Sequence, residues 1–187
     1  MTKTMLRDLA SDEKVVFTKT YSAQYTSYDH VIVGPEILCF IRSVPTFRPP
    51  FEEVIIVPLE VCIWIVDTIF SLLVSPTKGG VQDDVFAVNL EREDAPLRLR
   101  RSAQVSGPGE QGFTLFHRGM PLRVGFLSTS WADRTLFDEG LFPVLVRVAS
   151  EWAVAHGQPG PRREVATIRP NWMGKTPADT PPPSPDP

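Results

Sequence analysis

The sequence predicts an α+β domain in which an antiparallel sheet packs against two helices. Segments of strand length with β-branched and alternating residues occupy 14–42 and 85–128, an apolar segment covers 58–74, and an amphipathic pattern covers 141–156. The connections between strand segments are shorter than the crossover that parallel strands require. We therefore expect an antiparallel meander over 85–128, extended by N-terminal strands and covered by both helices.

The N-terminal part contains three strand candidates. They are rich in β-branched and apolar side chains and lie at residues 14–20, 30–34 and 36–42. Gly34 and Pro35 mark a turn between the last two. We expect residues 1–13 to form a short helix or a frayed arm, and the prolines within 43–53 predict an irregular connection.

Residues 54–74 form the most apolar stretch, with 16 of 21 residues aliphatic, aromatic or cysteine. Pro58 suits the first turn of a helix, so we expect a helix over 58–74, with 54–57 as extended chain leading into it. At helical spacing, four polar or aromatic residues share one stripe: Glu60, Trp64, Asp67 and Ser71. The other faces are apolar, so Glu60 and Asp67 are expected to be buried polar residues.

Three interpretations of this apolar segment stay open. A core helix enclosed by a sheet and a second helix is apolar nearly all round. The segment is also suited to docking onto a partner or a membrane, or to spanning a membrane through 54–74. The two carboxylates cost about 3 kcal/mol each at the centre of a span, which offsets most of the apolar gain. The core helix is the favoured interpretation.

The second half has a different periodicity. Short strand candidates alternate with Gly- or Pro-containing turns at residues 85–92, 97–104, 113–119 and 122–128. Leu141, Val144, Leu145 and Val148 recur at helical steps, and Gly157 ends the predicted helix. Residues 164–168 are a further strand candidate. We expect one domain over 1–173 and a disordered proline-rich tail over 174–187.

The two cysteines, Cys39 and Cys62, lie among apolar neighbours and do not form a CxxC pair. We favour two buried free thiols over a disulfide. The N-terminus lacks an apolar run of signal-peptide length, so cytoplasmic residence is expected, with membrane association through 54–74 as the alternative. No metal or cofactor is expected.

Two sets of residues are candidate binding surfaces. Tyrosines offer a large contact area at low entropic cost, and arginines on a sheet face can bind anions. The sets are Tyr21, Tyr25 and Tyr28, and Arg98, Arg100, Arg101, Arg118 and Arg123. Alternation places Arg98 and Arg100 on one face, opposite Leu97 and Leu99. The formal net charge of −3 and the absence of aromatic residues among the arginines argue against a nucleic-acid partner.

No local catalytic motif is present. The three histidines, His30, His117 and His156, are far apart in the sequence and belong to no metal-binding or nucleophile signature. We therefore expect no catalytic residues and a non-enzymatic bacterial domain that binds another protein, in an accessory or immunity/inhibitor-like role. An enzyme whose site is assembled from distant residues is the further alternative.

Residues 21–80 contain Pro58-Leu59, then Asp67-Thr68-Ile69-Phe70, then Pro76, after a tyrosine-rich tract. This pattern resembles the small bacterial lipoproteins of the YceK/YidQ type. The resemblance implies a bacterial protein with a non-enzymatic role in the cell envelope. The lipoprotein signal and its acylated cysteine are absent from this sequence, and residues 85–156 have no counterpart in the pattern.

Overall fold

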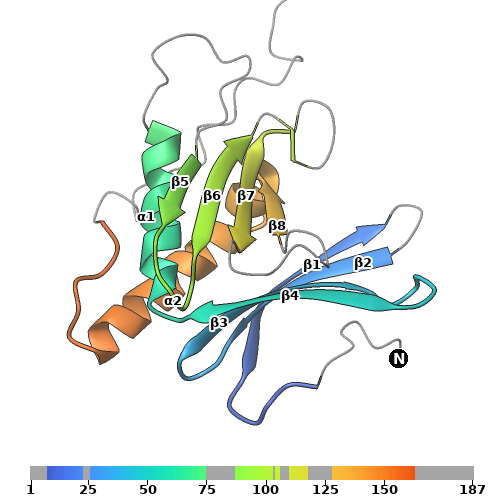
Figure 1. The fold of residues 1–187 in the computed structure, drawn as a ribbon, viewed down its shortest axis with the longest axis horizontal. Helices are drawn as coiled ribbons and strands as arrows, with labels where there is room; N and C mark the ends of the chain where they lie inside the picture. The colour runs from blue at the N-terminus through green and yellow to red at the C-terminus, as the bar shows by residue number, and fades with distance from the viewer. Residues whose placement is uncertain are drawn as a thin grey trace, which may run out of the picture.

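Two four-stranded antiparallel sheets and two α-helices make up the protein, which confirms the predicted α+β class (Figure 1). The structure is a computed structural model, and it describes residues 8–22, 26–74, 87–102, 104–105, 110–117 and 128–162. Within these residues the order of elements is four strands and a helix, followed by four strands, a π-helical turn and a helix. The predicted single sheet is therefore two sheets, because the helix after the fourth strand separates the two meanders along the chain.

Sheet A is a meander in the order β1-β2-β3-β4. Its strands are β1 (Lys14–Ser22), β2 (Thr26–Val33), β3 (Ile37–Val44) and β4 (Phe51–Pro58). The prediction of an irregular connection over 43–53 is wrong at both ends of this range, where residues 43–44 belong to β3 and residues 51–53 belong to β4. The prolines of the range all lie in the turn between these strands. The tyrosine-rich tract belongs to the β1–β2 hairpin, in which Tyr21 pairs with Ser27 and Tyr28 pairs with Thr20.

Helix α1 (Val61–Val74) follows β4 directly. The expected start at Pro58 is wrong, because Pro58 is the last residue of β4 and pairs with Ile37. Since β4 is an edge strand of sheet A, the missing N–H of proline is tolerated there. Residues 54–74 are thus divided between a strand and a helix. Among the described residues, no helix has the length and apolar character needed to cross a membrane.

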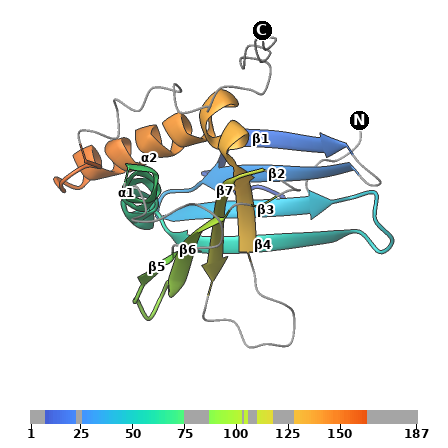
Figure 2. The same ribbon diagram turned by 90° about the horizontal axis from the view of Figure 1, so that it is seen from above.

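Sheet B has the order β5-β6-β7-β8. Its strands are β5 (Ala87–Leu90), β6 (Leu97–Ser102), β7 (Gly112–His117) and β8 (Ser128–Ala132). The predicted strand over 122–128 overlaps β8 only at Ser128, because residues 122–127 lie outside the described residues. So do the predicted strand over 164–168 and the predicted tail over 174–187. In Figure 2 the strands of sheet B run across those of sheet A.

A π-helical turn, η1 (Arg134–Asp138), leads from β8 to helix α2 (Leu141–Ala155). Gly140 has φ of 86°, a left-handed conformation that glycine adopts without strain, and it starts α2. The predicted amphipathic helix is confirmed, since Leu141, Leu145 and Val148 are buried. Both figures show α2 lying across α1.

The main core joins both sheets and both helices. Phe40 of sheet A packs against Trp131 of sheet B with ring centroids 5.1 Å apart, which links the two sheets. Cys62 lies in this core, and Cys39 lies in a smaller cluster with Ile32 and Ile41. Both cysteines are buried and free, as the sequence predicts.

Candidate functional site

A groove with a volume of about 1050 Å³ opens between α1, β5 and the end of α2. Its lining combines aromatic, apolar and charged side chains from all three elements. Those on which the site depends are Trp64, Asp67, Val88, Leu90, Arg92 and Trp152. The groove joins segments that are almost 90 residues apart in the sequence, so only the tertiary fold creates it.

One wall of the groove is the polar stripe of α1. Glu60, Trp64, Asp67 and Ser71 all line it, which confirms that they share one side of the helix. The prediction that the two carboxylates are buried is wrong. Asp67 is half-buried, and the side chain of Glu60 is 39% exposed. The described residues enclose α1 on one side only, whereas the prediction assumed that protein covers it all round.

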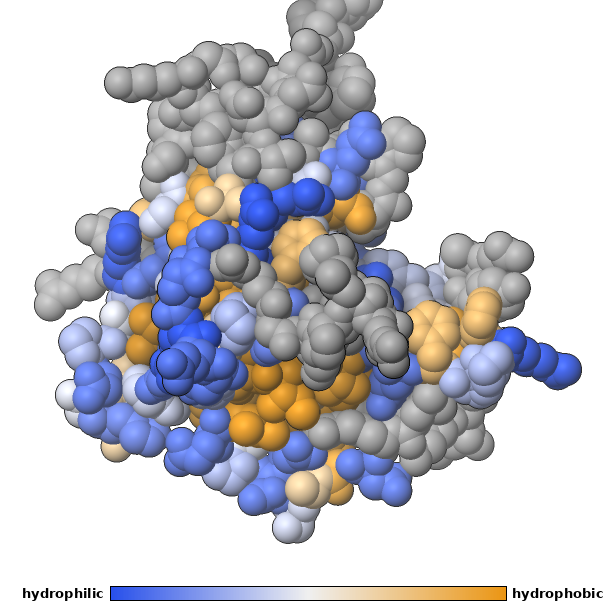
Figure 3. All heavy atoms as spheres, in the orientation of Figure 1, coloured by the Kyte–Doolittle hydropathy of each residue, from blue (hydrophilic) through white to orange (hydrophobic). Residues whose placement is uncertain are grey.

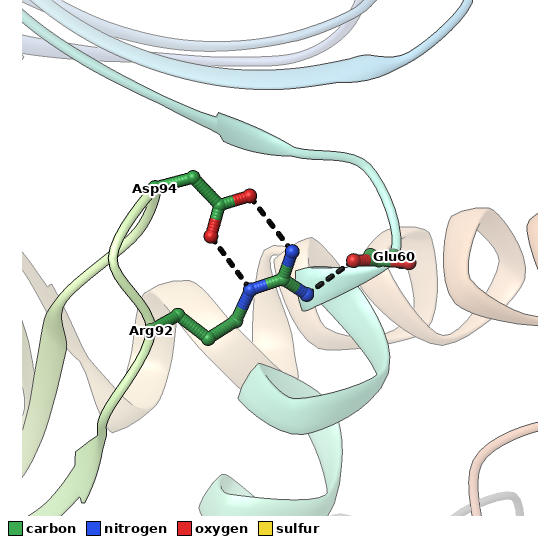
Figure 4. A network of polar contacts seen from close by, with 3 residues as sticks. All are labelled: Glu60, Arg92 and Asp94. Atoms are coloured by element: carbon green, nitrogen blue, oxygen red, sulfur yellow. Dashed lines mark hydrogen bonds and ion pairs between the residues drawn. The ribbon is translucent and has the colours of Figure 1, made fainter.

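Arg92, just after β5, binds two carboxylates: Asp94 in its own loop and Glu60, which precedes α1 (Figure 4). Its Nε donates to Asp94 Oδ1 at 2.8 Å, a second nitrogen donates to Asp94 Oδ2 at 2.7 Å, and the third donates to Glu60. These hydrogen bonds hold the pKa of Asp94 below its ordinary value and raise the pKa of Arg92. The network fixes the chain after β5 against α1, and it neutralises Arg92 at the rim of the groove.

Asp67 has a different environment. Its Oδ1 accepts a hydrogen bond of 2.9 Å from the backbone N–H of Arg162, which holds the segment after α2 against α1. Within the described part of the chain, no lysine, arginine or histidine side chain forms an ion pair with Asp67. Its negative charge therefore faces the groove without a cationic partner from these residues.

The end of α2 supplies an aromatic wall. The rings of Trp152 and His156 stack at 4.5 Å with an angle of 18° between them, and both residues line the groove. His156 Nδ1 lies 2.9 Å from the carbonyl oxygen of Trp152, as suits a histidine at the C-terminal end of a helix. The amphipathic pattern places Trp152 on the core side of α2, but its side chain is only half-buried. Trp152 lines the groove because α1 packs beside this end of α2, and the amphipathic pattern of the sequence does not reveal where α1 lies.

Strand β5 borders the mouth of the groove. It pairs with β6 along one edge, and no described strand pairs with its other edge. Figure 2, which shows α1 nearly end-on, places β5 at the end of sheet B next to this helix. Val88 and Leu90 of β5 line the groove, and Val88 is 37% exposed. The site thus combines a side-chain surface with an open backbone edge.

The predicted tyrosine surface does not form as one patch. Tyr21 and Tyr28 lie on opposite faces of sheet A, since strand pairing sets Tyr28 beside Thr20 and not beside Tyr21. Burial, together with the nearby charge of Asp29, raises the pKa of Tyr21. Asp29 itself holds Arg42 through two hydrogen bonds of 2.9 and 3.1 Å. Tyr25 lies outside the described residues.

Of the three described residues of the predicted arginine patch, two share a face of sheet B. Arg98 and Arg100 lie opposite the buried Leu97 and Leu99, as alternation predicts. Arg101 faces the other way, where it forms an ion pair with Asp133 and lies over the ring of Phe113. Arg118 and Arg123 lie outside the described residues.

A second apolar surface lies at the start of β4. Phe51, the first residue of the strand, and Phe47, in the turn before it, are 39% and 36% exposed, and their ring centroids are 5.4 Å apart. Figure 3 shows further hydrophobic side chains over sheet A. Ile56 points to the other face of β4, where it lines a smaller hollow that shares Glu60, Arg92 and Trp152 with the groove. Phe51 therefore serves below as the control position.

In the described part of the chain, histidine, cysteine and acidic residues do not form a group of three that could hold a metal ion. No protein-family model and no curated protein matches this chain. The resemblance of residues 21–80 to the small bacterial lipoproteins stays a prediction. The function is therefore inferred from the groove itself.

Proposed function

We propose that this protein is a non-enzymatic bacterial interaction domain that binds another polypeptide in the groove between α1, β5 and α2. An accessory or immunity/inhibitor-like role suits such a domain. The observation that carries the proposal is the pair of half-buried tryptophans, Trp64 and Trp152, in an open groove beside a strand edge with which no described strand pairs.

The chemistry of the groove supports protein recognition. Tryptophan, tyrosine and arginine dominate the binding energy of protein interfaces, especially where a polar rim surrounds them. Here Trp64 and Trp152 are surrounded by Glu60, Asp67 and Arg92. A mixed lining of this kind suits a polypeptide, which presents apolar and charged side chains together.

The shape of the groove also favours a chain over a compact small molecule. The lining residues along α1 run from Glu60, just before the helix, to Ser71, which corresponds to about 16 Å at the helical rise. Strand β5, whose Val88 and Leu90 also line the groove, lies alongside α1 in Figure 1. A ligand that contacts all of these residues has to be elongated.

A peptide-display selection on the full chain tests this function. We expect clones whose binding weakens about thirtyfold in Trp64→Ala, because truncating a central aromatic residue of an interface costs about 2 kcal/mol or more. Phe51→Lys, at the exposed start of β4, is the matched control and should bind these clones like the unchanged protein. Circular dichroism verifies that both variants are folded.

Two outcomes contradict the proposal. One is that no clone binds the folded protein. The other is that clones bind equally well to Trp64→Ala and lose affinity for Phe51→Lys, which assigns binding to the start of β4.

A further inference from the structure

We infer that the segment bound in the groove is an extended strand that pairs with the free edge of β5 and places a lysine or arginine at Asp67. This inference rests on the proposed function and adds the conformation and the charge of the bound segment. Three observations carry it: the unpaired edge, the length of the groove and the carboxylate without a cation.

The backbone edge favours an extended ligand. The peptide groups on the outer edge of β5 have no strand partner among the described residues. An added strand satisfies these groups by main-chain hydrogen bonds and at the same time continues sheet B. Because Val88 and Leu90 face the groove, alternate side chains of the added strand point into the same space.

The dimensions agree with this geometry. The stripe from Glu60 to Ser71 is about 16 Å long, and an extended chain advances about 3.3 Å per residue. Roughly five residues of a strand therefore span the groove, with two or three of their side chains directed inward. Strand β5, with four residues, is of similar length.

The charges select a basic side chain. Glu60 and Asp94 already neutralise Arg92. Asp67 accepts a backbone N–H from Arg162, which also lines the groove, but no ion pair with Asp67 forms within the described ranges. A half-buried carboxylate gains more from an added cation than a fully exposed one does, because water screens the pair less. Trp64 lies one helical turn from Asp67, where an indole ring can also attract a cation.

Capped peptides of five residues test the inference on the full chain by NMR titration. The probe has valine at positions one and five, threonine at two and four, and lysine at three. The matched peptide has glutamate in place of the lysine. We expect the lysine peptide to bind about tenfold more tightly, with an affinity that falls as salt rises.

Two variants and two modified peptides identify the contacts. Asp67→Asn should reduce the preference for lysine to about twofold or less, because it removes the charge and keeps the shape of the side chain. Phe51→Lys should leave the preference unchanged. Alternate N–H groups of a strand point to opposite edges, so N-methylation either at positions two and four or at positions three and five should weaken binding, since one of these sets pairs with β5.

The outcomes separate this inference from the proposed function. If display clones bind in a Trp64-dependent manner but lysine and glutamate peptides bind alike, the inference is overturned and the proposed function stands. Binding that N-methylation leaves unchanged overturns the strand geometry. If no peptide shows Trp64-dependent binding, both proposals fail.

Two other occupants give distinct results. A second copy of the chain in the groove predicts a dimer that Asp67→Asn dissociates, as measured by sedimentation. A second possibility is that the groove is occupied by the chain's own segment after Arg162, which contains Arg163 and Arg169. In that case the lysine peptide binds only after Arg163→Glu and Arg169→Glu are introduced together. Either result overturns the assignment to a separate partner.

Discussion

The two sides of α1 differ sharply. Val61, Cys62, Ile65, Val66 and Ile69 are at most 2% exposed and pack into the core between the sheets. The other side carries the stripe that lines the groove. One apolar helix thus has two different environments: its buried side stabilises the fold, and its open side carries the aromatic and acidic groups to which the proposed function assigns ligand binding. Substitutions on the two sides should therefore affect different measurements.

The largest effect on stability is expected on the buried side. Ile65→Ala removes a fully buried side chain, and such truncations cost about 2–5 kcal/mol of unfolding free energy. Urea denaturation measures this loss. Under conditions in which the variant is folded, its peptide affinity should equal that of the unchanged protein. A variant that keeps its stability and loses its affinity contradicts the division between the two sides.

Trp64→Ala should show the opposite balance. This side chain is only partly buried, so we expect a loss of about 1–2 kcal/mol in unfolding free energy. Its peptide affinity should fall about thirtyfold. Urea denaturation and peptide titration are carried out on both Trp64→Ala and Ile65→Ala. Together the two variants distinguish a loss of stability from a loss of binding better than either variant alone. If both variants lose stability and affinity in the same ratio, the groove is not a separate functional surface.

Cys62 gives the core a dependence on alkaline pH. Burial raises the pKa of its thiol from 9.0 to about 12. Because the unfolded chain releases this proton first, the stability linked to Cys62 is fully present below pH 9 and is lost as the pH rises towards 12. The loss approaches about 1.4 kcal/mol per pH unit within that window. Urea denaturation of the unchanged protein and of Cys62→Ala measures the unfolding free energy at pH 8 and pH 10. The decrease between the two pH values should be smaller in the variant. An equal decrease in both proteins excludes Cys62 as its source.

The smallest effect is expected at the rim. Hydrogen bonding to Arg92 lowers the pKa of Asp94, so the stability it contributes is present above the ordinary aspartate pKa and is lost as the pH falls through the lowered value. Since this carboxylate is exposed, Asp94→Asn should change stability only slightly at pH 7. Thermal unfolding between pH 3 and pH 7 measures the effect. A large loss at pH 7 means that the network contributes more to the fold than its exposure suggests.

Local patterns predicted much of the fold. Helix α2 and the alternation of Leu97, Arg98 and Leu99 followed from periodicity, because one side of each element faces the core. The division into two sheets and the strand conformation at Pro58 did not. Both depend on which segments pair in space, and a proline at the end of an edge strand looks like a helix start in the sequence.

The site was predicted only in part. The spacing of Glu60, Trp64, Asp67 and Ser71 marked the polar stripe of α1, but the stripe was assigned to a buried interior. Val88, Arg92 and Trp152 complete the groove, and no local pattern connects them to α1. A ligand site formed by three separate elements is visible only once their packing is known.

The most direct test is an amide-resolved NMR titration of the full chain with the lysine peptide. The account predicts that the largest shift changes fall on residues 87–90 and on the stripe of α1, while Ile65 and Phe51 stay unchanged. Shift changes that centre on β4, or that leave 87–90 unaffected at saturation, would contradict it.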